Sequence, residues 1–90
     1  MAKYLVRVVL HNANWETYDK FHETMRLNGF ERQVVGGDGK IFNLPDAEYI
    51  AIKNEYIDNV RDKVIKFAEM YVQKYDVLVS EVLGMSWYLN

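Results

Sequence analysis

The chain contains no cysteine, a single proline and only two histidines among its 90 residues. Without cysteine, a disulfide scaffold, a zinc–thiolate site and a thiol nucleophile are all excluded. No apolar run approaches the ~20 residues that a membrane-spanning helix requires. The opening residues Met1 to Lys3 lead directly into a strand-like pattern that carries charges, which is not typical of a secretory signal peptide. We therefore expect a cytoplasmic protein with no membrane partner.

The chain also lacks a large excess of positive or negative charge. It has 11 Lys and Arg residues and 13 Asp and Glu residues, which give a formal net charge of −2. Bulk charge therefore does not indicate a nucleic-acid binder, and any such role has to come from a local patch. What the chain does have is apolar material: half of its residues are hydrophobic and 14% are aromatic. That composition is globular, and the length fits one domain over residues 1–90, whose modest core a dimer would enlarge.

Hydrophobic periodicity predicts four strands and two helices. Alternation and β-branched residues predict the strands, and apolar residues at three- and four-residue steps predict the helices. Asn12 or Asn14 is a candidate N-cap of the first helix, and Asn54 of the second. Asn28 and Gly29 form a stop signal after the first helix. The predicted strands are 3–11, 30–35, 47–53 and 77–83, and the predicted helices are 15–28 and 55–73.

This β-α-β-β-α-β order predicts an α+β domain of the ferredoxin-like kind, with one four-stranded antiparallel sheet, both helices on one face and a short C-terminal extension. The helices are expected to cover Tyr4, Val6, Val8, Leu10, Ile50 and Ile52. The opposite face is then left with Lys3, Leu5, Arg7, Val9 and His11 from the first strand and Tyr49, Ala51 and Lys53 from the third.

Two interpretations of this second, open sheet face stand side by side. In the first it is a homodimer interface, because Leu5 and Val9 favour burial. In the second it binds RNA, with the Tyr49 ring stacking on a base while Arg7 and Lys53 hold phosphate. The apolar residues favour the dimer, and the two interpretations are not exclusive.

The C-terminal segment after Gly84 is a second indication of a dimer. Trp87, Tyr88 and Leu89 are large apolar residues that a solvated terminus would rarely carry. They either fold back over the protein's own core or add a short strand to the sheet edge of a partner. We favour the second alternative, which places all three residues at a dimer interface.

The two histidines are the candidate proton-transfer groups. His11 ends the first strand beside a loop and a helix start, a place where phosphate groups often bind. Because imidazole titrates close to neutral pH, a histidine there could transfer protons in RNA cleavage. His22 lies four residues before Arg26, and with Lys20 these residues form a basic stretch that is a candidate phosphate clamp. The alternatives are a loop histidine bonded to backbone and a solvated helix face with ion pairs to its own acidic neighbours.

Signals for a metal or a cofactor are lacking. Neither H-x-x-x-H nor H-E-x-x-H occurs, and Asp38 lies in a Gly-rich loop without the pattern of a calcium loop. The segment from Gly36 to Gly39 is not followed by the Lys-Ser/Thr of a phosphate-binding loop, and it predicts a hairpin turn. We therefore expect no metal site and no cofactor.

From Tyr4 to about Ala51 the chain resembles the GhoS family of small bacterial antitoxins, which are sequence-specific endoribonucleases. The residues that carry the resemblance keep their spacing without gaps and are Tyr4-Leu5-Val6, Met25, Phe30, Val34, Gly39, Leu44, Asp46 and Tyr49. The resemblance implies a ferredoxin-like fold similar to the small CRISPR-adaptation endoribonucleases, which dimerise. It also implies a role in RNA cleavage for basic residues on the first helix, and those positions hold Lys20 and His22 in this chain.

Two hypotheses of function follow. Because no carboxylate stands near the end of the first strand, where the small CRISPR-adaptation proteins often have one, the first is a metal-independent RNA-binding or RNA-cleaving protein of the antitoxin type. In it, Arg7, Lys20 and Arg26 bind phosphate, and His11 or His22 transfers protons. The second is a non-catalytic homodimeric interaction protein of the phage, plasmid or toxin–antitoxin kind. It binds a protein partner instead of RNA.

Overall fold

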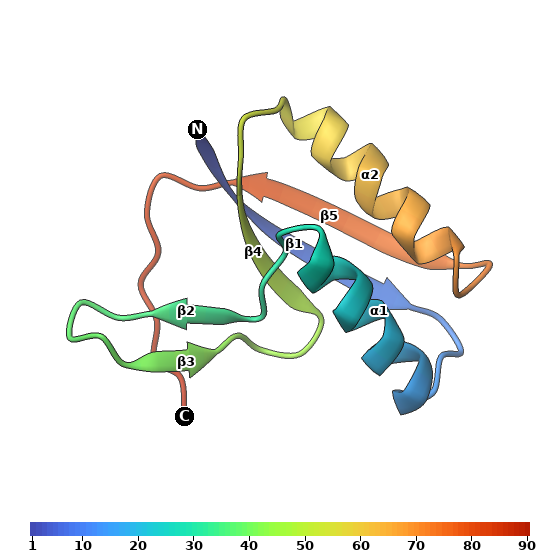
Figure 1. The fold of residues 1–90 in the computed structure, drawn as a ribbon, viewed down its shortest axis with the longest axis horizontal. Coiled ribbons are helices and arrows are strands. Elements are labelled where there is room, and N and C mark those ends of the chain that lie inside the picture. Colours follow the sequence, from blue (N-terminus) through green and yellow to red (C-terminus); the bar gives the residue numbers. More distant parts are fainter.

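The computed structural model describes all 90 residues as a small α+β domain with two helices and two antiparallel sheets (Figure 1). The α+β class predicted from periodicity is confirmed. No helix has the length and apolar character needed to cross a membrane. The elements in chain order are β1 (Ala2–Leu10), α1 (Trp15–Leu27), β2 (Gln33–Val35), β3 (Ile41–Asn43), β4 (Glu48–Lys53), α2 (Ile57–Glu69) and β5 (Tyr75–Glu81).

The main sheet has three strands in the order β4-β1-β5, and β2 and β3 form a separate hairpin. The hairpin joins the main sheet through one bridge, in which Glu31 and Ile50 exchange backbone hydrogen bonds of 2.8 and 2.7 Å. The predicted single four-stranded sheet is therefore wrong, because β2 pairs with β3, a strand that the alternation did not predict. Pairing across the short turn at Gly36 to Gly39 closes a small loop at low entropic cost, and it directs β2 away from β4 after the bridge.

The ends of α1 follow the sequence signals, and the start of α2 does not. Asn14 caps α1, since its side-chain Oδ1 accepts a hydrogen bond of 2.9 Å from the Thr17 backbone N–H. Gly29 ends the same helix with φ at +85°, a left-handed conformation that favours glycine. The predicted Asn54 cap of α2 is wrong, because the helix begins after Tyr56, which makes no side-chain capping bond.

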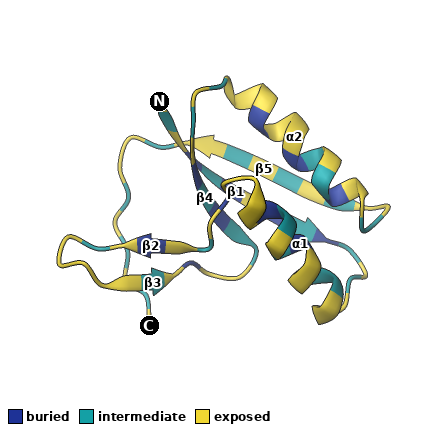
Figure 2. Ribbon diagram, viewed as in Figure 1, coloured by how far each residue is buried: buried dark blue, intermediate teal, exposed yellow.

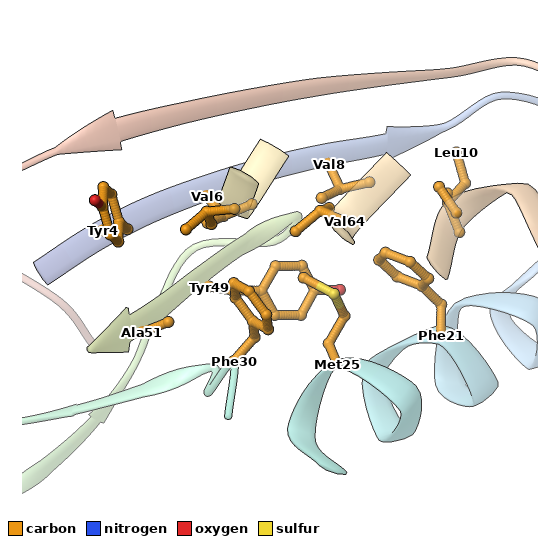
Figure 3. Packing of buried hydrophobic residues seen from close by; sticks show 12 residues of the cluster. Tyr4, Val6, Val8, Leu10, Phe21, Met25, Phe30, Tyr49, Ala51 and Val64 are labelled. Atoms are coloured by element: carbon orange, nitrogen blue, oxygen red, sulfur yellow. The ribbon is translucent and has the colours of Figure 1, made fainter. Parts of the chain in front are cut away.

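One face of β1 forms the base of the core, as alternation predicted. Its residues Tyr4, Val6, Val8 and Leu10 are each at most 3% exposed. Figure 3 shows Leu10 near Phe21 of α1 and Tyr4 at the other end of β1, near Ala51. Figure 2 shows buried positions along β1, β4 and one side of each helix. The rest of this core cluster is Phe30, Tyr49, Ala51, Val60, Val64 and Ala68.

The two faces of β4 are the reverse of the prediction. Tyr49 is 0% and Ala51 is 3% exposed beneath the helices, whereas Ile52 is 59% exposed. Register explains the reversal: Tyr49 lies opposite Val6 and Ala51 lies opposite Tyr4, and directly opposed residues of antiparallel strands share a face. The prediction was wrong because both faces of this strand are largely apolar, so alternation alone does not choose between them.

The face of the main sheet that points away from the helices, the open sheet face, therefore has a different composition from the one predicted. It keeps Leu5, Arg7 and Val9 of β1 as expected. By the same register it gains Leu78 of β5, opposite Arg7, and Ile52 of β4, opposite Lys3. Leu78 is 62% exposed, so apolar groups stand bare on this face.

The C-terminal segment runs past the hairpin without joining a sheet (Figure 1). Met85, Trp87 and Leu89 are half-buried while Tyr88 is 89% exposed, which is the alternation of an extended segment lying on a surface. The Trp87 ring lies 6.2 Å from that of Phe42 in β3, and no backbone–backbone hydrogen bond holds residues 83–90. Within one chain the segment thus folds back on its own hairpin, and addition to a partner's sheet stays a prediction.

Candidate functional site

Two adjoining cavities open between α1 and the segments on either side of the β2–β3 hairpin. Their volumes are about 500 and about 450 Å³, and they share four lining residues, Asp19, His22, Arg32 and Asp46. We name the combined groove the α1 cleft. The first cavity is also lined by Glu23, Arg26, Phe30, Glu31, Gln33, Asn43 and Leu44, and the second by Trp15, Tyr18 and Ala47. The α1 cleft is therefore mainly polar, with cations, carboxylates and amides around one space.

His22 lies where the two cavities meet and is held from below by Tyr49. Its Nδ1 is 2.5 Å from the Tyr49 hydroxyl, and its ring centroid is 5.9 Å from that of Tyr18. The second ring nitrogen, Nε2, has no hydrogen-bond partner in the protein. Burial lowers the pKa of His22, and the positive charge of Arg32 lowers this pKa further. The imidazole is therefore neutral at neutral pH.

Tyr49 connects the α1 cleft to the core. Its ring packs edge-on against Phe21 with the centroids 5.9 Å apart, while its hydroxyl reaches His22. Burial is the main cause that raises the pKa of Tyr49, so the phenol keeps its proton across the physiological range. Tyr49, which the sequence pattern predicted on the open sheet face, therefore holds His22 in the cleft through a hydrogen bond.

The charged residues of the α1 cleft partly neutralise one another. Arg26 makes two hydrogen bonds to Glu23, of 2.5 and 3.0 Å, and this contact lowers the pKa of the Glu23 carboxyl. Arg32 is less tightly held, because its nearest ion-pair contact is 4.0 Å from Asp46. Arg32 is therefore the cation of the cleft that is freest to bind an anion.

The structure disperses most of the predicted phosphate-binding residues. His22 and Arg26 line the α1 cleft as neighbours, but Lys20 is exposed on α1 and lines neither cavity, and Arg7 lies on the open sheet face. His11 pairs instead with Asp76, at 2.9 Å between Nε2 and Oδ2. The chain does not bring the two histidines into one site.

Two placements on the open sheet face are corrected by the reversal of β4. Tyr49 is fully buried, so its ring offers no surface on which a base could stack. Lys53 lies on the same side of β4 as Tyr49, where its ammonium donates a 2.5 Å hydrogen bond to the Asn28 carbonyl. The same ammonium is 4.8 Å from the centroid of the Phe30 ring, and these contacts hold it away from the open face.

Sequence reasoning missed most residues of the α1 cleft, among them Trp15, Arg32 and Asp46. Trp15 is the first residue of α1 and is 72% exposed at the rim of the second cavity. Arg32 and Asp46 lie in the segments that flank the hairpin. No periodicity signals them, because only the fold brings these segments against α1.

The structure contains no group of three or more His, Cys, Asp or Glu residues placed to hold a metal ion. Comparison of the chain with models of known protein families and with curated proteins finds no match. The functional proposal therefore rests on the geometry of the α1 cleft.

Proposed function

We propose that the protein binds single-stranded RNA in the α1 cleft and belongs functionally with small antitoxin endoribonucleases. The observation that carries this proposal is His22, which stands with Arg32 in a polar cavity of about 500 Å³ while the exposed Trp15 lines the adjoining one. Single-stranded RNA is recognised by stacking of bases on aromatic side chains and by cations that hold the backbone. The α1 cleft supplies both kinds of group.

Each group has a distinct task in this proposal. Arg32 binds a phosphate through its planar guanidinium, which matches phosphate geometry. Trp15 takes the stacking role that the sequence assigned to Tyr49. Gln33 and Asn43, whose side chains are 3.1 Å apart in the hairpin, present amides that can bind base edges. The carboxylates in the cleft favour contacts with base amino groups and ribose hydroxyls, so the site suits RNA better than a bare polyanion.

Cleavage in the α1 cleft uses the RNA's own nucleophile. The ribose 2′-oxygen attacks the adjacent phosphorus, its proton passes to a base of the cleft, and the bond from phosphorus to the 5′-oxygen breaks. The leaving oxygen takes a proton from water, so the products carry a 2′,3′-cyclic phosphate and a 5′-hydroxyl. Incubation of mixed RNAs with the protein in EDTA tests this step, and cyclic-phosphate ends are the expected result. Intact RNA after prolonged incubation would restrict the proposal to binding.

The fold supports a relation to ferredoxin-like proteins. We propose that the protein is a variant of the ferredoxin-like arrangement in which the second strand, β2, pairs with β3 and not with the main sheet. The Glu31–Ile50 bridge lies at the edge of β4 where a fourth strand would pair, and the strand then turns away to join β3. This proposal is supported by the order of the remaining strands, β4-β1-β5, which with two helices on one side (Figure 1) is compatible with a βαββαβ sheet that lacks one strand.

RNA binding is tested by fluorescence anisotropy with a labelled single-stranded RNA of mixed sequence. If Arg32 neutralises one phosphate, a rise in salt from about 50 to about 200 mM weakens binding roughly 2.6-fold, because each neutralised phosphate of a single strand contributes a slope of about −0.7. The matched control is Lys66→Ala on α2, an exposed cation outside the cleft, which should bind as the wild type does. No binding at the lower salt concentration contradicts the proposal.

A second candidate function, a homodimeric interaction protein, is favoured by the open sheet face. Leu78 and Ile52 are 62% and 59% exposed there, and Leu5 and Val9 are half-buried beside them. Apolar residues gathered on one face are typical of a surface that a second copy or another protein covers.

Light scattering on the free protein tests the dimer. We expect a dimer at micromolar concentrations for the wild type and a monomer for Leu78→Lys, because the new ammonium would face Arg7 across the strands. Tyr56→Lys, at a residue that is 83% exposed ahead of α2, should leave the dimer intact. A wild type that stays monomeric at several hundred micromolar would contradict this candidate.

A further inference from the structure

The geometry points to a fixed hydrogen-bond donor in the α1 cleft: Tyr49 holds His22 in the tautomer with its proton on Nε2, so that His22 binds an oxyanion and does not act as a general base. The inference deepens the proposed function, and it rests on that function only for the choice of an RNA phosphate as the anion. The tautomer itself follows from contacts within the protein.

The argument begins with the hydroxyl of Tyr49. The residue is 0% exposed, so water does not reach the phenol, and its one hydrogen-bond partner is Nδ1 of His22 at 2.5 Å. A buried hydroxyl group that failed to donate its proton would lose a hydrogen bond at substantial cost. Because burial also keeps the phenol protonated, its O–H has to donate to Nδ1.

The consequence for His22 follows from the chemistry of imidazole. A neutral ring carries one proton, and a nitrogen that accepts a hydrogen bond cannot carry it. With Nδ1 accepting from Tyr49, the proton of His22 resides on Nε2. That nitrogen has no partner in the protein, and the side chain lines both cavities. The α1 cleft therefore contains an N–H donor that makes no hydrogen bond within the protein.

The charged groups around His22 decide what this donor binds. Asp19, Glu23 and Arg26 line the cleft from α1, Arg32 from the segment before β2 and Asp46 from the segment before β4. Glu23 is paired with Arg26, so Arg32 and the His22 donor remain to hold an oxyanion together. The remaining carboxylates of the cleft repel a free anion and weaken its binding. An anionic group within a longer ligand binds more tightly, because the rest of the ligand makes further contacts in the cleft.

This assignment changes the role that the sequence suggested for His22. A neutral imidazole with its proton on Nε2 has no lone pair to offer in the cleft, so it cannot remove the proton of a 2′-hydroxyl. The base of the proposed cleavage has to be a carboxylate, and Asp19 lines both cavities with His22. His22 binds the phosphate through its Nε2–H, and Tyr49 is a positioning residue.

The tautomer is tested on the free protein without RNA. A long-range proton–nitrogen correlation spectrum, recorded at a pH where His22 is neutral, should show the proton on Nε2. Tyr49→Phe keeps the ring and removes the hydroxyl, so the fraction of the Nδ1–H tautomer should rise above its wild-type value, with a circular dichroism spectrum showing that the variant is folded. A wild-type His22 that carries its proton on Nδ1 overturns the inference.

Binding is tested with two variants of His22. The amide nitrogen of Gln occupies nearly the place of Nε2 and donates a hydrogen bond, but Gln cannot act as a base. His22→Gln should therefore bind RNA, and inorganic phosphate at millimolar concentration, within about twofold of the wild type, while His22→Ala should bind each about fivefold more weakly. An equal loss in both variants overturns the donor assignment. If RNA does not bind at all but phosphate binds with this pattern, the proposed function fails and the inference stands.

Discussion

Arg32→Glu is expected to lower the affinity for single-stranded RNA at least tenfold, a loss of about 1.4 kcal/mol or more. The substitution removes the cation that is least neutralised in the α1 cleft, since its contact with Asp46 is 4.0 Å long. It also places a carboxylate next to the phosphate, in a cleft that already contains Asp19 and Glu31. Anisotropy with the labelled RNA measures the effect.

The matched control for this substitution is Arg61→Glu. Arg61 lies on α2 and lines neither cavity of the α1 cleft, and its replacement changes the net charge by the same two units. We expect less than a threefold loss for the control at moderate salt, because distant surface charges are screened. Equal losses in the two variants would show that bulk charge, and not the α1 cleft, governs binding.

Tyr49→Ala is expected to reduce the free energy of unfolding by about 3–5 kcal/mol, the range for truncating a buried aromatic side chain to alanine. The Tyr49 ring is 0% exposed and packs edge-on against Phe21. Loss of the Tyr49 hydroxyl would also leave Nδ1 of His22 without its hydrogen-bond partner. Ile52→Ala is the matched control, because Ile52 lies three residues later in the same strand and is 59% exposed. We expect less than about 1 kcal/mol for the control.

Urea denaturation followed by circular dichroism measures both variants. The reversed result, a large loss for Ile52→Ala and a small loss for Tyr49→Ala, would restore the face assignment that alternation predicted and would remove the support of His22. Because a loss of 3–5 kcal/mol approaches the total stability of many small domains, Tyr49→Phe serves as a milder variant. It keeps the ring packing and should remain folded.

Sequence patterns predicted those elements whose signals are local. The alternation in β1 gives the strand one fully apolar face, so the buried face could be predicted. Asn14 and Gly29 mark the ends of α1, because helix capping acts within a few residues. The α+β class followed from these elements. By contrast, β4 carries apolar residues on both faces, and the identity of its buried face is decided only by pairing with β1.

The candidate site was less predictable for the same physical reason. His22 and Arg26 stand one helical turn apart, so their proximity could be predicted from spacing alone. Arg32 and Asp46 come from the two segments that flank the hairpin, and they meet α1 because β2 pairs with β3 instead of extending the main sheet. The hairpin turn itself has a local signal at Gly36 to Gly39, but the position of the hairpin against α1 depends on long-range packing, which no local pattern encodes.

The most direct test of the account is to titrate nitrogen-15-labelled protein with a single-stranded RNA and to map the backbone amide shifts. We predict that the largest shifts fall on the residues of the α1 cleft, above all Trp15, His22 and Arg32, with little change on the open sheet face. Shifts concentrated at Leu5, Arg7 and Leu78, or none at all, would contradict the claim that the α1 cleft is where this protein binds RNA.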